Sequence, residues 1–299
     1  MSAGLHVGVI GVGNMGGAMA RRLLDQGCAL SACDIDASRV LALQAAGAVV
    51  AAQPESLAPC ALVIVAVVDA LQTHQVLFGR GGVAAAMAPG GCVMLCPTIA
   101  PAHVEACAAG LAERGIACID APMSGGPLRA RDGTMSLMVA CDDAVFERWH
   151  GVLRLLASRL FRVGTRIGDG ARTKLVNNLL AAINLAGAAE ALALASRLDL
   201  DPALTLSVIE QSSGQSWIGS DRLRRALADE AAPLAHMALL AKDSALALQA
   251  ARPTALPLPL GNAAAQTFAS ALQSGLAAAD DSALWRWMLG ESPQQVPPK

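Results

Sequence analysis

The chain has 299 residues, a formal net charge of −2 at pH 7 and an apolar content of 54%. This length is sufficient for two domains of ordinary size. A charge so close to zero provides no basic field, so we expect no nucleic-acid partner. The longest charge-free stretch, residues 81–104, is interrupted by prolines and glycines, so we also expect no membrane partner and no membrane span.

Eight cysteines occur in the first half of the chain, and none of them forms a C-x-x-C pair. Most stand among alanines and valines, as small core residues do. The N-terminus has no basic segment before its first apolar run, so we expect no signal peptide and a cytoplasmic location with reduced thiols. The five histidines show neither H-E-x-x-H nor clustering with carboxylates, so we predict no metal site.

The first predicted strand, Val7–Ile10, leads directly into a G-x-G-x-x-G loop and then into a helix. Gly11 permits a tight turn, Gly13 lets the backbone approach a pyrophosphate, and Gly16 lets the helix lie close to the strand. The phosphates of a dinucleotide would bind the N–H groups at the helix N-terminus. The predicted cofactor-binding residues here are Gly11, Val12, Gly13, Asn14, Met15 and Gly16.

A second predicted strand, Ala29–Cys33, is followed by Asp34, 18 residues after Gly16. An acid at this position bonds the ribose hydroxyls and repels the 2′-phosphate of NADP. The sequence therefore predicts a dinucleotide site with NAD as the cofactor and Asp34 as a cofactor-binding residue.

Further apolar runs alternate with helical segments up to about residue 163. The predicted strands are Leu62–Val68, Cys92–Leu95, Ile116–Ile119 and Ser136–Val139. This alternation predicts a mostly parallel sheet covered on both faces. Ligands of such sheets bind at the carboxyl ends of the strands, so Val67, Val68 and Thr98 are predicted to contact the cofactor.

The segment after Asp120 reads Ala-Pro-Met-Ser-Gly-Gly-Pro. Ser124, Gly125 and Gly126 would expose several N–H donors, which suits a substrate carboxylate. An ordinary turn between a strand and a helix is the alternative interpretation.

Strand signals stop after Gly168, and all later segments are predicted to be helical. We therefore expect a first domain over residues 1–165 and an all-helical second domain over residues 166–299. Within that second half the predicted helices are Ala171–Arg197, Pro202–Gln211, Asp221–Ala228, His236–Ala251 and Leu260–Leu276. Only residues 292–299, which are rich in proline and glutamine, are predicted to be disordered.

Lys174 and Asn178 are four residues apart near the start of an apolar helix, so they share one helical face. A buried lysine has its pKa lowered by up to about 3–5 units, whereas a helix N-terminus contributes under about one unit. Burial would therefore produce a neutral amine that can accept a proton. The alternative is a solvated surface lysine.

Four motifs, in this order, resemble those of the 3-hydroxyisobutyrate dehydrogenase-related family of β-hydroxyacid dehydrogenases, over residues 5–288. They are G-x-G-x-M-G at 11–16, D-A-P-x-S-G-G at 120–126, G-x-G-x-x-x-K-x-x-x-N at 168–178, and Lys242-Asp243. The resemblance implies an α/β fold: an N-terminal Rossmann-like, mostly parallel sheet and an all-helical C-terminal domain, joined by a long interdomain helix.

The resemblance also implies roles for individual residues. Lys174 would be the catalytic acid/base, and Asn178 would help to hold the substrate. Ser124, Gly125 and Gly126 would bind the substrate carboxylate, whereas Thr98 and Lys242 would border the cofactor. NADP-dependent relatives commonly carry an Asn-Arg pair after the second strand. Here that place holds Asp34-Ile35-Asp36, and the next arginine is Arg39, so NAD is favoured. Pro97 removes one backbone donor beside Thr98.

The C-terminal half is similar to the L-threonate dehydrogenases of this family, in Ser212–Trp217, Pro257–Leu260 and Asp280–Ala283. The expected activity is NAD-dependent oxidation of a hydroxyl of a small sugar acid, such as L-threonate, with Lys174 as general base. Oxidation of 3-hydroxyisobutyrate or reduction of tartronate semialdehyde remains an alternative. A dinucleotide-binding protein without catalysis is the alternative from another class.

Three assignments in the second half stay open. Trp217 would wall the substrate pocket or lie in the core or a dimer interface. Lys242-Asp243 would belong to the cofactor site or form a structural ion pair. Arg222, Arg224 and Arg225 are expected on a solvated helix face. Alanine- and leucine-rich helix faces are a liability in a monomer, so we expect a homodimer or homotetramer.

Overall fold

The computed structural model describes residues 5–229 and 233–291. The chain divides into two compact units after Lys174. The long helix α8 (Asp169–Arg197) begins in the first unit and continues into the second. The predicted disorder over residues 292–299 lies outside the described residues.

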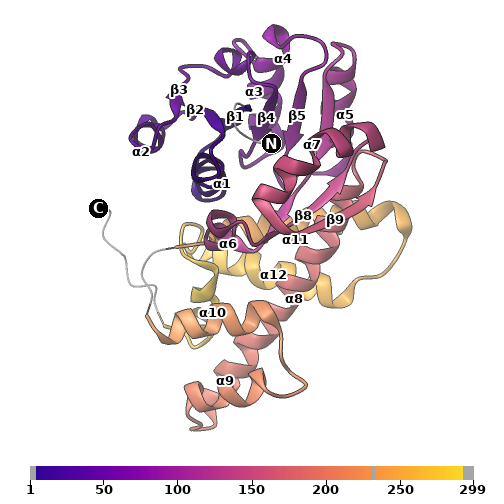
Figure 1. The fold of residues 1–299 in the computed structure, drawn as a ribbon. Coiled ribbons are helices and arrows are strands. Elements are labelled where there is room, and N and C mark those ends of the chain that lie inside the picture. The colour runs from indigo at the N-terminus through magenta and orange to yellow at the C-terminus, as the bar shows by residue number, and fades with distance from the viewer. Residues whose placement is uncertain (1–4, 230–232, 292–299) are drawn as a thin grey trace. The chain divides into compact units, whose positions relative to one another are not determined.

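The first unit contains a nine-stranded sheet in the order β3-β2-β1-β4-β5-β6-β8-β7, with β9 paired to β8 (Figure 1). Strands β1 to β6 are parallel to one another, whereas β8 is antiparallel to β6. The expected mostly parallel sheet is therefore confirmed. The strands are β1 (His6–Ile10), β2 (Ala29–Cys33), β3 (Val49–Val50), β4 (Leu62–Val65), β5 (Cys92–Leu95), β6 (Ala117–Asp120), β7 (Met123–Ser124), β8 (Met135–Ala140) and β9 (Ala157–Gly164).

Three strands have no counterpart among the predicted ones. β3 and β7 span two residues each, which is too short for a periodic pattern to appear. β9 mixes arginines with apolar residues and is mostly half-buried or exposed, so it lacks the apolar run of a central strand. β4 is also shorter than predicted: it ends at Val65, so Val67 and Val68 follow the strand instead of closing it.

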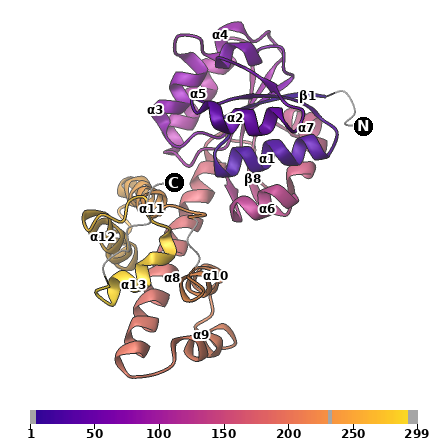
Figure 2. The same cartoon turned by 90° about the vertical axis from the view of Figure 1, so that its left-hand side faces the viewer.

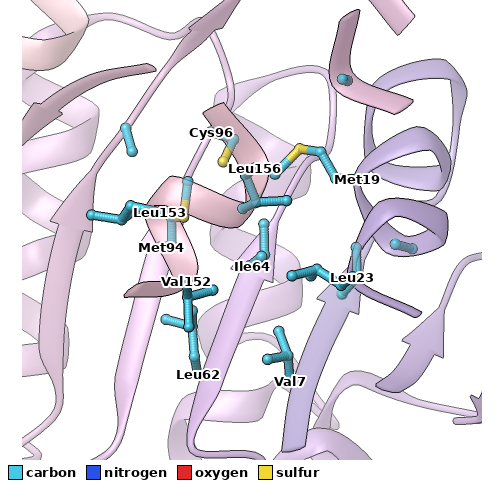
Figure 3. Packing of buried hydrophobic residues seen from close by; sticks show 14 of the residues in the cluster. Val7, Met19, Leu23, Leu62, Ile64, Met94, Cys96, Val152, Leu153 and Leu156 are labelled. Atoms are coloured by element: carbon cyan, nitrogen blue, oxygen red, sulfur yellow. The ribbon is translucent and has the colours of Figure 1, made fainter. Parts of the chain in front are cut away.

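Alternating side chains of the sheet supply two cores. Leu62 and Ile64 of β4 belong to the cluster that includes residues of α1 (Asn14–Asp25) and α7 (Asp143–Leu156), as Figure 3 shows. Their neighbours Val63 and Val65 belong to the cluster that includes residues of α3 (Ala70–Phe78) and α5 (Pro101–Ala112). Because successive residues of a strand point to opposite faces of the sheet, both faces are buried. The remaining helices of the unit are α2 (Ala37–Gln44), α4 (Val83–Ala86) and α6 (Gly126–Asp132), with a 3₁₀ turn at Pro54–Leu57.

The described residues of the second unit form helices and the turns that connect them, with one isolated β-bridge between His236 and Asp280. Its core includes Leu185 and Leu192 of α8 and Phe268 of α12. The expected all-helical second half is confirmed, and α8 is its longest helix (Figure 2). The other helices are α9 (Pro202–Glu210), α10 (Trp217–Leu227), α11 (Met237–Ala251), α12 (Pro259–Gln273) and α13 (Leu284–Met288), with 3₁₀ turns at Arg252–Thr254 and Asp281–Ala283.

Among the described residues, α8 is the one helix long and apolar enough to cross a membrane, judged by length and composition alone. Its most apolar 18-residue window has a mean hydropathy of 1.6, and 39% of that window is buried inside the protein. Core helices of large proteins share these features. The expectation that the chain has no membrane span stays a prediction.

The arginines of α10 do not form the predicted solvated face. Arg224 is exposed, but only 13% of the Arg222 side chain and 9% of the Arg225 side chain are accessible. Arg222 Nε donates to Asp281 Oδ1 at 2.5 Å, and Arg225 Nη2 donates to Asp280 Oδ2 at 2.9 Å. The prediction failed because these acids lie more than fifty residues away in sequence and meet α10 only in the fold.

Candidate functional site

The glycine loop between β1 and α1 is tightly constrained. Gly11 has φ +85°, and its N–H donates to the carbonyl of Cys33 at 2.9 Å. A Cβ atom at Gly16 would lie 1.9 Å from the Gly11 carbonyl oxygen, and one at Gly11 would lie 3.0 Å from Val67 Cγ1. The loop therefore lies against the segment that follows β4, at the point where the strand order reverses between β1 and β4. Open sheets bind ligands at such a point.

Asp34, directly after β2, holds the glycine loop in place. Its Oδ2 accepts the N–H of Val12 at 2.7 Å, and its Oδ1 accepts the N–H of Asp36 at 2.9 Å. A cavity of about 390 Å³ lies beside the loop and is lined by Val12, Gly13, Asn14, Gly17, Ala18, Arg21, Arg39, Ala42 and Leu43. The glycine loop and the start of α1 line this cavity, as the phosphates of a dinucleotide require, and Asp34 is joined to the loop by its hydrogen bond from Val12.

Asp120, the last residue of β6, caps the start of α8. Its Oδ2 accepts the N–H of Gly168 at 2.9 Å and the N–H of Ala171 at 3.1 Å, and the residue is only 1% exposed. A carboxylate at this position satisfies helix donors that have no partner within the helix. Lys174 follows one turn later, so Asp120 anchors the helix turn that carries the lysine.

The two glycines of the G-x-G-x-x-x-K motif allow the start of α8 to lie close to β8 and to Asp120. Gly168 has φ +95°, a conformation that favours glycine. A Cβ atom at Gly170 would lie 2.7 Å from the Met138 carbonyl oxygen and 2.8 Å from Asp120 Cγ. The motif therefore places the start of α8 against β8 and against the Asp120 carboxylate.

The segment with the predicted carboxylate-binding residues is attached to the same strand. Ser124 pairs with Ser136 of β8, and the N–H of Met138 donates to the Pro122 carbonyl at 3.0 Å. Gly125 and Gly126 follow with φ +126° and +75° at the start of α6. β8 thus connects the Ser-Gly-Gly segment to the start of the lysine helix.

The wild-type protein is expected to lose stability as the pH rises, because Asp120 ionises, and the Asp120→Asn variant is expected to lack this loss. Burial raises the pKa of Asp120 to about 6, although the N–H groups of Ala171, Gly168 and Gly170 lower it. A raised pKa means that protonated Asp120 stabilises the folded state relative to the unfolded state. This stabilisation is complete below the ordinary pKa of 3.8 and is lost as the pH rises through about 6. A shift of about two units corresponds to about 3 kcal/mol.

The measurement is urea unfolding of the wild type and of Asp120→Asn between about pH 4 and pH 7. The free energy of unfolding of the wild type should fall relative to the variant by about 2.4 kcal/mol over this range, most of the full shift. Burial also raises the pKa of Asp281 to about 6, but both proteins contain that residue and its effect cancels. A constant difference between the two proteins would contradict the prediction.

Lys174 and Asn178 are both buried, with 8% of each residue exposed. The alternative of a solvated surface lysine is therefore excluded. Asn178 Nδ2 donates to Asp243 Oδ2 at 2.6 Å, and its Oδ1 accepts from Asn177 Nδ2 at 2.9 Å. These bonds fix the orientation of the Asn178 amide one helical turn after the lysine.

Lys242 and Asp243 lie on α11 in the second unit and form an ion pair, Nζ to Oδ1, at 3.0 Å. Asp243 therefore contacts both Lys242 and Asn178, which connects α11 with α8. The structural ion pair considered for these residues is present, and the cofactor role of Lys242 stays a prediction.

Two further predicted residues occupy accessible places. Thr98 follows β5 and is half-buried. Trp217 begins α10, whose N-cap is Ser216, and 46% of the tryptophan is exposed. Its ring centroid lies 6.0 Å from Arg222 Cζ. This exposure excludes a core position for Trp217, so a pocket wall and an interface residue remain.

Asp120 was not among the predicted site residues. The sequence signal for Asp120 was an acid at the end of an apolar strand and at the start of a proline- and glycine-rich segment. Its partners at residues 168–171 are more than forty residues away, so only the fold reveals them.

Two family models match the chain. One, described as the NAD binding domain of 6-phosphogluconate dehydrogenase, covers residues 6–164. The other, described as NAD-binding of NADP-dependent 3-hydroxyisobutyrate dehydrogenase, covers residues 168–288.

Relatives match over nearly the whole length. An L-threonate dehydrogenase of Cupriavidus necator is 39% identical over 93% of this chain and 94% of its own. A 2-hydroxy-3-oxopropionate reductase of Escherichia coli is 33% identical, with 94% and 96% covered. The crystal structure of a 3-hydroxyisobutyrate dehydrogenase from Salmonella typhimurium is 34% identical with a TM-score of 0.89, covering 95% of this chain and 99% of that one.

Proposed function

Because this chain belongs to the 3-hydroxyisobutyrate dehydrogenase-related family of NAD-dependent hydroxyacid dehydrogenases, we propose that it oxidises a hydroxyl of a small sugar acid, L-threonate in particular. The observation that carries the substrate assignment is the 39% identity to an L-threonate dehydrogenase over nearly the full length of both chains. The product would be the corresponding 2-oxo acid.

Lys174 is the proposed general base. NAD, when bound, supplies the hydride acceptor. The substrate hydroxyl must lose a proton in the same reaction, and the Lys174 amine would accept it at Nζ. To do so the amine must be neutral, and its burial supports this because low polarity disfavours the cation.

The remaining predicted site residues are proposed to bind the substrate. The N–H groups of Ser124, Gly125 and Gly126 would bind its carboxylate, since both glycines have the positive φ that turns the backbone at the start of α6. Asn178 would form a hydrogen bond with a hydroxyl of the substrate, and Trp217 would form one wall of the substrate pocket. The exposure of Trp217 supports a ligand-facing role.

The proposed cofactor residues divide into two groups. The first group surrounds the glycine loop and comprises Gly11, Val12, Gly13, Asn14, Met15, Gly16, Asp34, Val67 and Val68. Thr98 and Lys242 form the second group, assigned by the family resemblance. The cavity beside Gly13 and the two hydrogen bonds accepted by Asp34 support the first group.

A second candidate is oxidation of 3-hydroxyisobutyrate or reduction of tartronate semialdehyde, which is 2-hydroxy-3-oxopropionate. The relative named as a reductase of that compound and the Salmonella structure named as a 3-hydroxyisobutyrate dehydrogenase support it. The alternative of a protein without catalysis is not retained, because the relatives are dehydrogenases and reductases.

A substrate comparison tests the proposal. We expect the kcat/KM for L-threonate with NAD, followed by absorbance at 340 nm, to exceed that for 3-hydroxyisobutyrate and for the stereoisomers of threonate by at least about tenfold, a difference of about 1.4 kcal/mol in transition-state binding. Tartronate semialdehyde with NADH completes the panel. A higher kcat/KM for 3-hydroxyisobutyrate or for the semialdehyde would overturn the assignment to L-threonate.

We further propose a homodimer or homotetramer. One face of α8 exposes Val176, Leu180 and Leu194, and Leu198 directly follows the helix; each is more than half accessible. Such an apolar stripe is unusual on a monomer. Sedimentation equilibrium that showed only monomer would refute this.

We also propose a cytoplasmic location, supported by eight unpaired cysteines; secretion of the intact protein from its source cells would refute it.

The proposed domain boundary between residues 165 and 166 is supported by the gap between the two family models. Limited proteolysis that cleaved the chain only elsewhere would argue against that division.

A further inference from the structure

An ion pair lies beside the cavity at the glycine loop. Arg39 Nε lies 3.2 Å from Asp36 Oδ2, and both side chains are about half exposed. Arg39 also lines the cavity of about 390 Å³, and its Nη1 lies 3.3 Å from the position that a Cβ atom would take at Gly13. The guanidinium therefore extends from α2 toward the glycine loop.

Asp36 is held firmly in this position. Its Oδ1 accepts the N–H of Ser38 at 3.0 Å and the Ser38 hydroxyl at 2.6 Å, so it caps α2. Its own N–H donates to Asp34 Oδ1 at 2.9 Å. The hydrogen bonds from Ser38 lower the pKa of Asp36 below its ordinary value, so the carboxylate is ionised at neutral pH.

The cations that line this cavity already have acidic partners. Arg21 pairs with Asp25, Nε to Oδ1, at 3.4 Å, and Arg39 pairs with Asp36. NADP differs from NAD by a phosphate on the ribose hydroxyl that an acid such as Asp34 binds. Enzymes that accept this phosphate place an arginine near it. This chain has the arginine at the cavity, but a neighbouring carboxylate neutralises it.

We propose that Asp36 is a determinant of cofactor specificity, which acts by holding Arg39 in an ion pair and so withholding its guanidinium from a 2′-phosphate. Asp34 excludes NADP by repulsion at the ribose, and Asp36 excludes it by removing the compensating cation. Loss of the Asp36 charge should therefore admit NADP through Arg39.

The test is the Asp36→Asn variant, because asparagine keeps the helix cap and removes the charge. Dissociation constants of NAD⁺ and NADP⁺, from quenching of tryptophan fluorescence, give the preference without requiring turnover. The result is thus independent of the roles proposed for Lys174 and L-threonate. We expect the affinity ratio of NADP⁺ to NAD⁺ to rise at least tenfold, and kcat/KM with any accepted hydroxyacid to shift likewise.

Two further variants test whether the change in cofactor preference depends on Arg39 and on the charge of Asp36. Arg39→Gln in the Asp36→Asn background should return the ratio to within about threefold of the wild type. Ser38→Ala removes a hydrogen bond from Asp36 but leaves its charge, so the ratio should not change by more than about twofold. An unchanged ratio in Asp36→Asn would overturn the proposal. So would a rise that persists in the double variant, because the Asp36 charge would then act without Arg39.

Discussion

The Lys174→Ala variant is expected to lose turnover by at least about a hundredfold and by up to about ten-thousandfold, the range contributed by general acid–base catalysis. The side chain is buried on the first turns of α8, and the substrate hydroxyl would have no other assigned group to take its proton. The kcat at saturating hydroxyacid and NAD, followed at 340 nm, measures the effect.

NAD affinity should be nearly unchanged in Lys174→Ala, because the glycine loop and Asp34 that would hold the dinucleotide are formed by other segments. Lys174→Arg is the informative companion variant. Arginine keeps the positive charge but does not release its proton in proteins, so this variant should be as inactive as Lys174→Ala. A kcat within tenfold of wild type in either variant would show that Lys174 is not the base.

The Gly16→Ala variant is expected to weaken NAD binding by at least about a hundredfold, equivalent to about 2.7 kcal/mol. The new Cβ would lie 1.9 Å from the Gly11 carbonyl oxygen and 3.1 Å from Ala66 Cβ. The Gly11 carbonyl belongs to backbone that cannot move away like a flexible side chain, so the loop itself must shift. Overpacking of this kind also costs about 1–3 kcal/mol of stability. Titration calorimetry with NAD measures the affinity.

Gly151→Ala is the matched control for this change. Gly151 lies within α7, and a Cβ atom there would meet no heavy atom within 4 Å. Alanine should stabilise that helix by about 0.5–1 kcal/mol and leave NAD affinity unaltered. If Gly16→Ala bound NAD as tightly as Gly151→Ala, the glycine loop would not be the phosphate site.

Most of the fold follows from local patterns. Strands β4 and β5 are continuous apolar runs, and β1 and β2 are apolar apart from His6 and Ser31. Burial of both faces of the sheet makes such runs readable from sequence. In the second half, helices α8 to α12 were predicted with shifts of up to four residues at their ends, whereas the short helix α13 was missed. The strands that were missed, β3, β7 and β9, have neither length nor apolar continuity.

The chemistry of the site was predictable where one short motif contains all of its parts. The glycine loop, Asp34, and the Lys174–Asn178 spacing are of this kind, because each depends on residues within a single strand, turn or helix. Val67 and Val68 were placed in the right segment but on the wrong side of a strand end.

The sequence by itself determined most of the elements and their order, the family and the positions of the candidate lysine and cofactor loop. Only the tertiary structure decided which partners the buried charges meet: Asp120 meets the start of α8, Asp243 meets Asn178, and Asp280 and Asp281 meet the α10 arginines. The physical reason is that periodicity and turn chemistry are local, whereas a buried charge selects its partner through contacts between segments far apart in the chain.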